Sequence, residues 1–380
     1  MRTLPARAAT TAVVVSVLLV RRSRGLVPSS SAFFRAARTL NYSPQTTRSM
    51  DATKPGESRG SPPPPALSAA LGAAVTIPPE ARSAVPGSKE IEEQRRPMRN
   101  PIGPNSRVLI VGGNRGIGLE FVRQCADRGA LVVATHRGID VPPELSDVID
   151  MYEGRVSALT MDVSDADSVE RAASELKSRD GDDDDGGDDC VLPLTHVIHS
   201  AGTYPTTGTS FDGTARGTRA SAPPVTADIM IETFQVNAVG PLIVAQAFVP
   251  LMGRREGGRS VDGDDDDDDD DGNGRVIPLP VLAVLSSKVG SVHDNGSGGA
   301  YAYRASKSAL NCICKSLSVD LAGQVSMVLL HPGYVRTEMT GMNGLIDADE
   351  SVEGMLRAVE STDSTVGFRW VDYKAELIPW

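Results

Sequence analysis

The most informative run of this sequence is Arg107-Val108-Leu109-Ile110-Val111-Gly112-Gly113-Asn114-Arg115-Gly116-Ile117-Gly118. It joins a short apolar segment, typical of a buried β-strand, to a glycine-rich turn that opens a helical pattern at 117–128. Glycines permit a tight turn and let the backbone approach a pyrophosphate, which the first N–H groups of the following helix can bind. Because the turn lies between a strand and a helix, it predicts a dinucleotide site. The residues expected there are Gly112, Asn114, Arg115, Gly116, Ile117 and Gly118.

The rest of the sequence beyond this run alternates apolar and amphipathic segments. This alternation predicts one α/β domain with a Rossmann-type, doubly wound parallel sheet of about seven strands. The expected strands are 107–111, 130–135, 156–162, 195–200, 281–287, 325–331 and 368–373. The expected helices are 117–128, 166–178, 227–252 and 300–321, with a shorter one near 352–359.

Composition defines the domain organisation. Residues 51–104 hold 11 of the 26 prolines and no apolar period, which predicts a disordered linker. Residues 105–380 carry the α/β pattern and are expected to form the folded domain. Two aspartate-rich tracts, near 180–189 and 254–275, fall between predicted elements; because like charges repel, they are expected to be solvated loop insertions.

The net charge of −11 is unevenly distributed and indicates no charged partner surface. Eight arginines lie in residues 1–50 and 16 aspartates in the two tracts, so the remainder is nearly neutral. We therefore predict no nucleic-acid partner. The four cysteines and five histidines lack metal-ligand spacing, so no metal site is expected. The composition also excludes a disulfide-stapled miniprotein, a collagen-like chain and a coiled-coil rod.

Residues 1–50 have the composition of a targeting segment. Arg2 and Arg7 precede an apolar run at 12–20, which suits a signal-peptide core and is too short for a membrane span. The segment contains no acidic residue, as in transit peptides. A signal core followed by Ser31-Ala32-Phe33-Phe34 resembles the bipartite presequences of complex algal plastids. We expect import into a plastid and no stable membrane span in the mature form; the alternatives are a mitochondrion, the secretory pathway or a membrane-anchored form.

The end of the second predicted strand indicates which cofactor the dinucleotide site takes. The strand ends at Thr135 and is followed by His136 and Arg137. None of these positions is an Asp or Glu that could bind a ribose 2′-hydroxyl. Arg137, together with Arg115 in the glycine-rich turn, could instead bind a 2′-phosphate by charge-assisted contacts. The expected cofactor is therefore NADP(H).

A second motif points to proton chemistry. Tyr303 and Lys307 are four residues apart on a predicted helix and so share one face. An ammonium beside a phenol favours the phenolate and lowers its pKa. Ser287 lies at the end of a predicted strand, where its hydroxyl could orient a carbonyl. Two alternatives are Tyr301, which lacks a lysine four residues on, and Ser286, which is expected inside the strand.

In order and spacing these motifs resemble the short-chain dehydrogenase/reductase (SDR) family over essentially all of 107–380. Val111 stands where the family's TGxxxGxG loop has its threonine, and His199 and Ser200 replace both asparagines of its NNAG motif. Thr337 matches the residue that contacts the cofactor carboxamide in PGxVxT. The further cofactor-binding residues that the resemblance implies are Asp162, Val163, Ser200, Ala201, Gly202, Pro332, Gly333, Val335 and Thr337.

The resemblance also implies the catalytic roles. Ser287 would position the oxygen of a small-molecule carbonyl, and Tyr303 would protonate it while NADPH delivers hydride. Lys307 would bind the nicotinamide ribose, lower the pKa of Tyr303 and pass a proton to a water held by the backbone of Asn237. The expected function is NADPH-dependent reduction of an aldehyde or ketone to an alcohol, and the oxidative direction is its alternative.

A narrower resemblance, to the C-factor and sniffer-like carbonyl reductase branch, rests on 295–311 and 367–380. Because that branch includes proteins named for developmental signalling, an NADP-binding signalling or scaffold protein with little turnover is the second hypothesis. A lid at 338–350 has no strong selecting group, which leaves the substrate open. Trp370 and Trp380 either line the substrate mouth or pack internally, and both a homo-oligomer and a monomer remain open.

Overall fold

The computed structural model of the chain describes residues 99–179, 192–215, 221–253 and 278–380. The predicted targeting segment, the linker as far as residue 98 and the aspartate-rich tracts at 180–189 and 254–275 lie outside these ranges.

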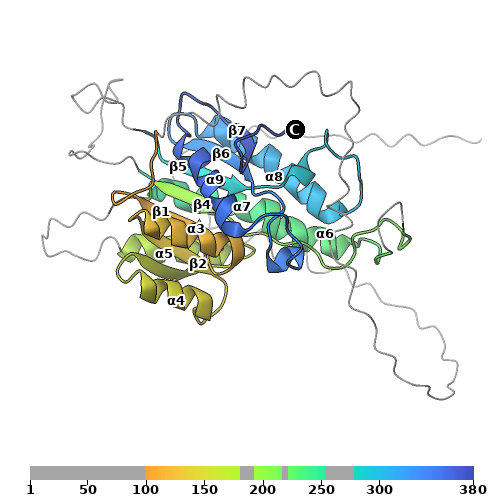
Figure 1. The fold of residues 1–380 in the computed structure, drawn as a ribbon, viewed down its shortest axis with the longest axis horizontal. Helices are drawn as coiled ribbons and strands as arrows, with labels where there is room; N and C mark the ends of the chain where they lie inside the picture. The colour runs from red at the N-terminus through yellow and green to blue at the C-terminus, as the bar shows by residue number, and fades with distance from the viewer. Residues whose placement is uncertain (1–98, 180–191, 216–220, 254–277) are drawn as a thin grey trace, which may run out of the picture. The chain divides into compact units, whose positions relative to one another are not determined.

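Seven parallel strands form one sheet in the order β3-β2-β1-β4-β5-β6-β7 (Figure 1). The predicted doubly wound α/β fold is thus confirmed. The strand order reverses between β1 and β4, so the carboxyl ends of these two central strands flank the crevice where such folds bind ligands. The strands are β1 Arg107–Val111, β2 Leu131–His136, β3 Val156–Thr160, β4 His196–His199, β5 Val281–Leu285, β6 Ser326–His331 and β7 Arg369–Asp372.

Helices cover both faces of the sheet, because alternate strand residues point to opposite sides. In β1, Val108 and Ile110 belong to the core under one helical layer, whereas Leu109 and Val111 belong to the core under the other. The first layer contains α3 Gly116–Asp127, α4 Pro143–Met151 and α9 Ala348–Glu360. The second contains α5 Ala166–Arg179, α7 Gly240–Phe248 and α8 Tyr301–Asp320.

The structure differs from the predicted helices in two places. Helix α4 was not predicted, because it begins at the second of two consecutive prolines and buries only Leu145 and Val148, too few for a clear period. The helix predicted at 227–252 is broken into α6 Ala227–Phe234, a π-helical turn at Gln235–Val239, α7 and a 3-10 turn at Val249–Leu251. Among the described residues, the stretch Ala227–Leu251 alone has the length and mean hydropathy (1.4) of a membrane-crossing helix.

The folded domain begins at least six residues before the predicted start at 105. The backbone N–H groups of Arg99 and Asn100 donate to the carbonyl of Glu360, at 2.8 and 2.9 Å. The buried Asn100 side chain also donates to the carbonyl of Thr362 (2.6 Å), and Arg99 forms an ion pair with Asp363 (2.9 Å). The first residues of the domain are therefore joined by hydrogen bonds and an ion pair to the end of α9 and the residues just after it.

Candidate active site

The glycine-rich turn after β1 is packed so closely that side chains do not fit. A Cβ on Gly118 would lie 1.9 Å from the carbonyl oxygen of Gly112, and Gly112 itself has φ +80° and faces Ala201. Helix α3 starts at Gly116, and its N-cap, Arg115, makes no side-chain capping hydrogen bond. Since the first N–H groups of a helix attract anions, this turn provides the backbone cradle that a pyrophosphate needs.

Arg115 was expected to face a 2′-phosphate, but in this structure it pairs with Glu338. The Arg115 Nη1 to Glu338 Oε2 distance is 2.5 Å, and both side chains are largely exposed. Glu338 follows Thr337, whose Cγ2 lies 3.6 Å from the position a Cβ would take on Gly116. The loop after β6 therefore rests on the glycine-rich turn.

Asp162, just beyond β3, is held by its own loop. Its carboxylate accepts hydrogen bonds from the backbone N–H and the hydroxyl of Ser164, at 2.9 and 2.6 Å. Burial acts to raise the pKa of Asp162, but these bonds and the nearby charge of Arg137 together lower it below its ordinary value. Val163 is buried, and Arg137 is exposed after β2. Arg137, Asp162 and Val163, all predicted to bind the cofactor, thus lie at the carboxyl ends of the neighbouring strands β2 and β3.

Ser287, Tyr303 and Lys307 come together at the carboxyl end of β5. Ser287 lies two residues beyond β5, and its side chain is hydrogen-bonded to Tyr303 in the first turn of α8. The buried Lys307 donates from Nζ to the carbonyl of Leu285 (3.0 Å), and Nζ lies 5.9 Å from the centre of the Tyr303 ring. The three residues predicted to be catalytic, Ser287, Tyr303 and Lys307, therefore lie close together in the structure.

The ionisation of this cluster differs from the expectation. Burial raises the pKa of Tyr303 to about 12, although the hydrogen bond with Ser287 acts to lower it. The expected lowering of the pKa of Tyr303 by Lys307 is therefore not found. Burial also lowers the pKa of Lys307 to about 8. At neutral pH the phenol is protonated and most of the lysine is charged.

Asn237 lies inside the π-helical turn and is fully buried. Its Oδ1 accepts from the N–H of Thr203 (2.8 Å), while its Nδ2 donates to the Thr203 carbonyl (2.8 Å) and to Ser306 Oγ (3.1 Å). In an α-helix the Asn237 carbonyl would accept from residue 241, which is a proline and has no N–H. The Asn237 side chain thus connects the segment at Thr203 to Ser306 of α8. The backbone carbonyl of Asn237 lacks the donor that an α-helix would supply.

The segment after β4 crosses next to the glycine-rich turn. The N–H groups of Ser200 and Ala201 both donate to the carbonyl of Val111, at 2.9 Å. A Cβ on Gly202 would lie 3.4 Å from Asn237 Oδ1 and 3.6 Å from Lys307 Nζ. Gly202 therefore lies next to Asn237 and Lys307.

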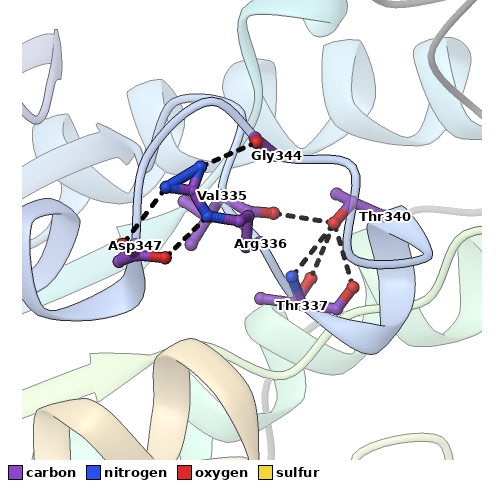
Figure 2. A network of polar contacts seen from close by, with 6 residues as sticks. All are labelled: Val335, Arg336, Thr337, Thr340, Gly344 and Asp347. Atoms are coloured by element: carbon purple, nitrogen blue, oxygen red, sulfur yellow. Dashed lines mark hydrogen bonds and ion pairs between the residues drawn. The ribbon is translucent and has the colours of Figure 1, made fainter.

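The loop after β6 is internally braced (Figure 2). Thr340 Oγ1 donates to the Val335 carbonyl (2.7 Å) and accepts from the N–H of Thr337 (3.0 Å). Arg336 pairs with Asp347 at 2.7 Å and donates to the carbonyl of Gly344 at 3.1 Å. These bonds connect the start of the predicted 338–350 lid to the residues on either side of it.

Pro332 and Gly333 connect β6 to this loop. The Pro332 carbonyl accepts from the hydroxyl of Ser351 (2.6 Å). Gly333 has φ +81°, and a Cβ there would lie 2.9 Å from the ring of Tyr373. Glycine is therefore required at this position by both backbone conformation and space.

The structure discriminates between the alternatives left by the sequence. Ser286 is buried and donates its hydroxyl to Asn311 Oδ1 (2.6 Å), whereas Tyr301 is 41% exposed and packs near Phe211. Trp370 is 1% exposed and belongs to the core; Trp380 packs against it. Of these serines and tyrosines, Ser287 and Tyr303 are the two that are hydrogen-bonded to each other.

Two aromatic residues of this region had no predicted role. The Tyr204 ring lies 4.9 Å from that of Tyr303, centre to centre. Burial raises the pKa of Tyr204, although Arg304 acts to lower it; Tyr334 adds a smaller raising effect. The Tyr334 hydroxyl is buried and has no hydrogen-bond partner among the described residues. Within those residues, no cluster of three or more His, Cys, Asp or Glu side chains could hold a metal ion.

Comparison with known proteins identifies the family. A family model described as short chain dehydrogenase matches residues 106–262. The C-signal protein of Myxococcus xanthus is 38% identical over 152 residues, which cover 40% of this chain and 78% of C-signal. The chain belongs to the short-chain dehydrogenase/reductase family, a family of oxidoreductases.

Solved structures show the same fold over the whole of the compared proteins. The carbonyl reductase Sniffer of Drosophila melanogaster is 26% identical to this chain, with a TM-score of 0.57. The match covers 73% of this chain and 99% of the Sniffer chain. A carbonyl reductase of Pseudomonas aeruginosa PAO1, solved in complex with NADP, is 28% identical to this chain, with a TM-score of 0.55. The match covers 72% of this chain and 99% of the reductase chain.

Proposed function

We propose that this chain is an NADPH-dependent reductase that converts a small-molecule aldehyde or ketone into an alcohol. The observation that carries the proposal is the cluster of Ser287, Tyr303 and Lys307 at the carboxyl end of β5. The two similar carbonyl reductase structures support the reaction class, and the NADP bound to one of them supports the cofactor.

The residues at the carboxyl ends of β1 and β2 fit NADP(H). The turn at 112–118 offers backbone rather than side chains to a pyrophosphate, as its close packing requires. After β2 the exposed Arg137 stands where an NAD-specific site would carry an acidic residue, and a guanidinium suits a 2′-phosphate. When bound, NADPH would supply the hydride that reduces the carbonyl carbon.

The proton side of the reaction follows from the ionisation of the cluster. Tyr303, with a pKa of about 12, is protonated at neutral pH and can donate its phenolic proton to the substrate oxygen. Ser287 is hydrogen-bonded to Tyr303 and so can donate to the same oxygen and orient it. Lys307 stabilises the phenolate that remains, because an ammonium beside an anion favours the charged form.

The test compares Tyr303→Phe with Tyr301→Phe in the full chain, using NADPH and a panel of aldehydes, ketones and quinones. We expect Tyr303→Phe to lower kcat by about 100- to 10,000-fold, the usual contribution of general acid catalysis, with NADPH affinity near normal. Tyr301→Phe removes an exposed phenol two residues away and should keep the wild-type rate. Equal losses in both variants would contradict the assignment.

The similarity to C-signal favours a second candidate, an NADP-binding signalling or scaffold protein with little turnover. The same panel distinguishes the two functions. NADPH binding without turnover of any carbonyl would support the second candidate and refute the first.

We also propose that residues 1–50 direct import into a plastid, on the grounds of the signal-like core and acid-free composition of that segment. A fluorescent protein fused to residues 1–50 should enter the plastid of an alga with complex plastids. Labelling of mitochondria or of the secretory pathway instead would contradict this proposal.

A further inference from the structure

The last residues of the sequence fold back against β7, and Trp380 is held there by aromatic contacts. The N–H of Ile378 donates to the carbonyl of Trp370 (3.0 Å). The Trp380 ring lies 5.2 Å from the ring of Trp370 and 5.8 Å from the ring of Phe368, centre to centre. Since Trp370 is a fully buried core residue, these contacts fix the place of the Trp380 backbone.

The main-chain carbonyl of Trp380 accepts two hydrogen bonds from the loop between β5 and α8. The donors are the N–H of His293 (3.0 Å) and the hydroxyl of Ser291 (3.2 Å). Ser291 is buried, and its hydroxyl also accepts from the N–H of Asp294 (3.1 Å). A carbonyl oxygen has two lone pairs, so both are used in binding this loop.

The first half of the same loop starts at Ser287 and rests on α8. The N–H of Gly290 donates to the carbonyl of Ser287 (2.8 Å), and the carbonyl of Gly290 accepts from the hydroxyl of Ser308 (2.7 Å). Gly290 lies so close to α8 that a Cβ on it would be 2.8 Å from the Cβ of Lys307. Helix α8 therefore holds the loop on one side of Ser287.

The second half of the loop is joined to the residue next to Ser287. The N–H of Ser291 donates to the carbonyl of Lys288 (3.0 Å), and the Asp294 carboxylate forms an ion pair with the Lys288 side chain (3.5 Å). A shift of Ser291 and Asp294 would therefore be passed to Lys288 and from there to Ser287. On this side the loop is held by Trp380.

We propose that Trp380 is a positioning residue for Ser287: its carbonyl, fixed by the packing of its indole ring, holds the loop between β5 and α8 in the place that presents the Ser287 hydroxyl to Tyr303. This inference rests on the proposed reductase function, in which Ser287 orients the substrate oxygen. Trp380 itself acts through the backbone of the loop and not on the reacting atoms.

The test compares a variant that loses the aromatic ring with one that keeps it. Trp380→Ala should lower kcat by about 3- to 10-fold, the size of one or two ordinary hydrogen bonds, with the KM for the carbonyl and the affinity for NADPH little changed. Trp380→Phe should stay within about twofold of wild type. If Trp380→Ala does not fold, Ser291→Ala, which removes one of the two donors and keeps the indole, replaces it.

A double-mutant cycle shows whether Trp380 acts through Ser287. In the Ser287→Ala background there is no hydroxyl left to position, so adding Trp380→Ala should lower kcat by less than about 1.5-fold further. The same fold-loss in both backgrounds would overturn the inference, because Trp380 would then stabilise the domain without acting on Ser287.

A readout independent of turnover separates this inference from the proposed function. In protein carrying tyrosine labelled with 13C at Cζ, the Tyr303 resonance, assigned by its loss in Tyr303→Phe, should shift at neutral pH in Trp380→Ala and not in Trp380→Phe. Wild-type protein without any carbonyl turnover would refute the proposed function, yet this resonance would still decide the role of Trp380. An unchanged Tyr303 resonance in Trp380→Ala, or an equal shift in both variants, would overturn the inference.

Discussion

The ion pair between Arg115 and Glu338 should oppose the binding of NADPH, and Glu338→Gln should remove that opposition. The pair joins the glycine-rich turn to the loop after β6 at 2.5 Å. Arg115 is one of the two arginines expected to contact a 2′-phosphate, so it must leave Glu338 before it can make that contact. The substitution keeps the shape of the side chain and removes its charge.

The size of the effect follows from the exposure of the pair. The side chains of Arg115 and Glu338 are 64% and 75% exposed, and ion pairs this exposed contribute about 0.2–1 kcal/mol. Relief of that amount tightens binding by about 1.4- to 5-fold. The gain should shrink at high salt, because salt screens exposed charges.

The assay is a fluorescence titration of NADPH and of NADH into wild-type and Glu338→Gln protein. We expect tighter binding of NADPH and no change for NADH, which has no 2′-phosphate. The matched control is Asp347→Asn, which removes the exposed Arg336–Asp347 pair from the same loop without touching Arg115. Equal gains for both cofactors, or weaker NADPH binding in Glu338→Gln, would refute the reasoning.

Three other perturbations test the turn, the domain boundary and the catalytic cluster. Gly118→Ala places a Cβ 1.9 Å from the Gly112 carbonyl, so it should weaken NADPH binding at least about tenfold in a fluorescence titration; wild-type affinity would contradict the close packing. Asn100→Ala leaves the buried Thr362 carbonyl without its donor and should lower the free energy of unfolding by about 1–3 kcal/mol in urea without changing kcat. Because Lys307 is charged only below its pKa of about 8, kcat/KM for reduction should fall as pH rises through that value. A rate that stays constant up to the titration of Tyr303 would show that the charge of Lys307 is not needed.

The central fold could be predicted because its signals are local. The apolar strand and glycine-rich turn at 107–118 lie in one run of sequence, and the spacing of Tyr303 and Lys307 is fixed by a single helix. The positions of the strands follow from short apolar runs in the same way, although several predicted strands extend one or two residues beyond the observed ones. Each of these features needs no knowledge of what lies elsewhere in the chain.

The features that could not be predicted depend on contacts between distant segments. The docking of Asn100 on Thr362, the packing of Tyr204 on Tyr303 and the pairing of Arg115 with Glu338 each join residues about a hundred or more positions apart. No local pattern encodes such contacts. The π-helical turn at Asn237 is an intermediate case. The sequence shows that Pro241 has no N–H, which indicates an interrupted helix, but it does not show that the interruption is a π-helical turn.

The ionisation of the catalytic cluster was mispredicted for a related reason. The spacing of Tyr303 and Lys307 suggested a lowered tyrosine pKa, but spacing contains no information about burial. In the fold, desolvation raises the pKa of Tyr303 to about 12 and lowers that of Lys307 to about 8. The depth of α8 against the sheet, rather than the pairing of the two residues, therefore dominates their protonation.

The loop after β6 contacts the glycine-rich turn, and this explains where each perturbation should be observed. Its base is braced by Arg336, Thr340 and Asp347 (Figure 2). Thr337 and Glu338 lie against the glycine-rich turn. Ser287, Tyr303 and Lys307 are held separately, by β5 and α8. A change at Glu338 should therefore alter cofactor affinity and leave the proton chemistry intact, whereas a change at Tyr303 should alter the proton chemistry and leave cofactor affinity near normal.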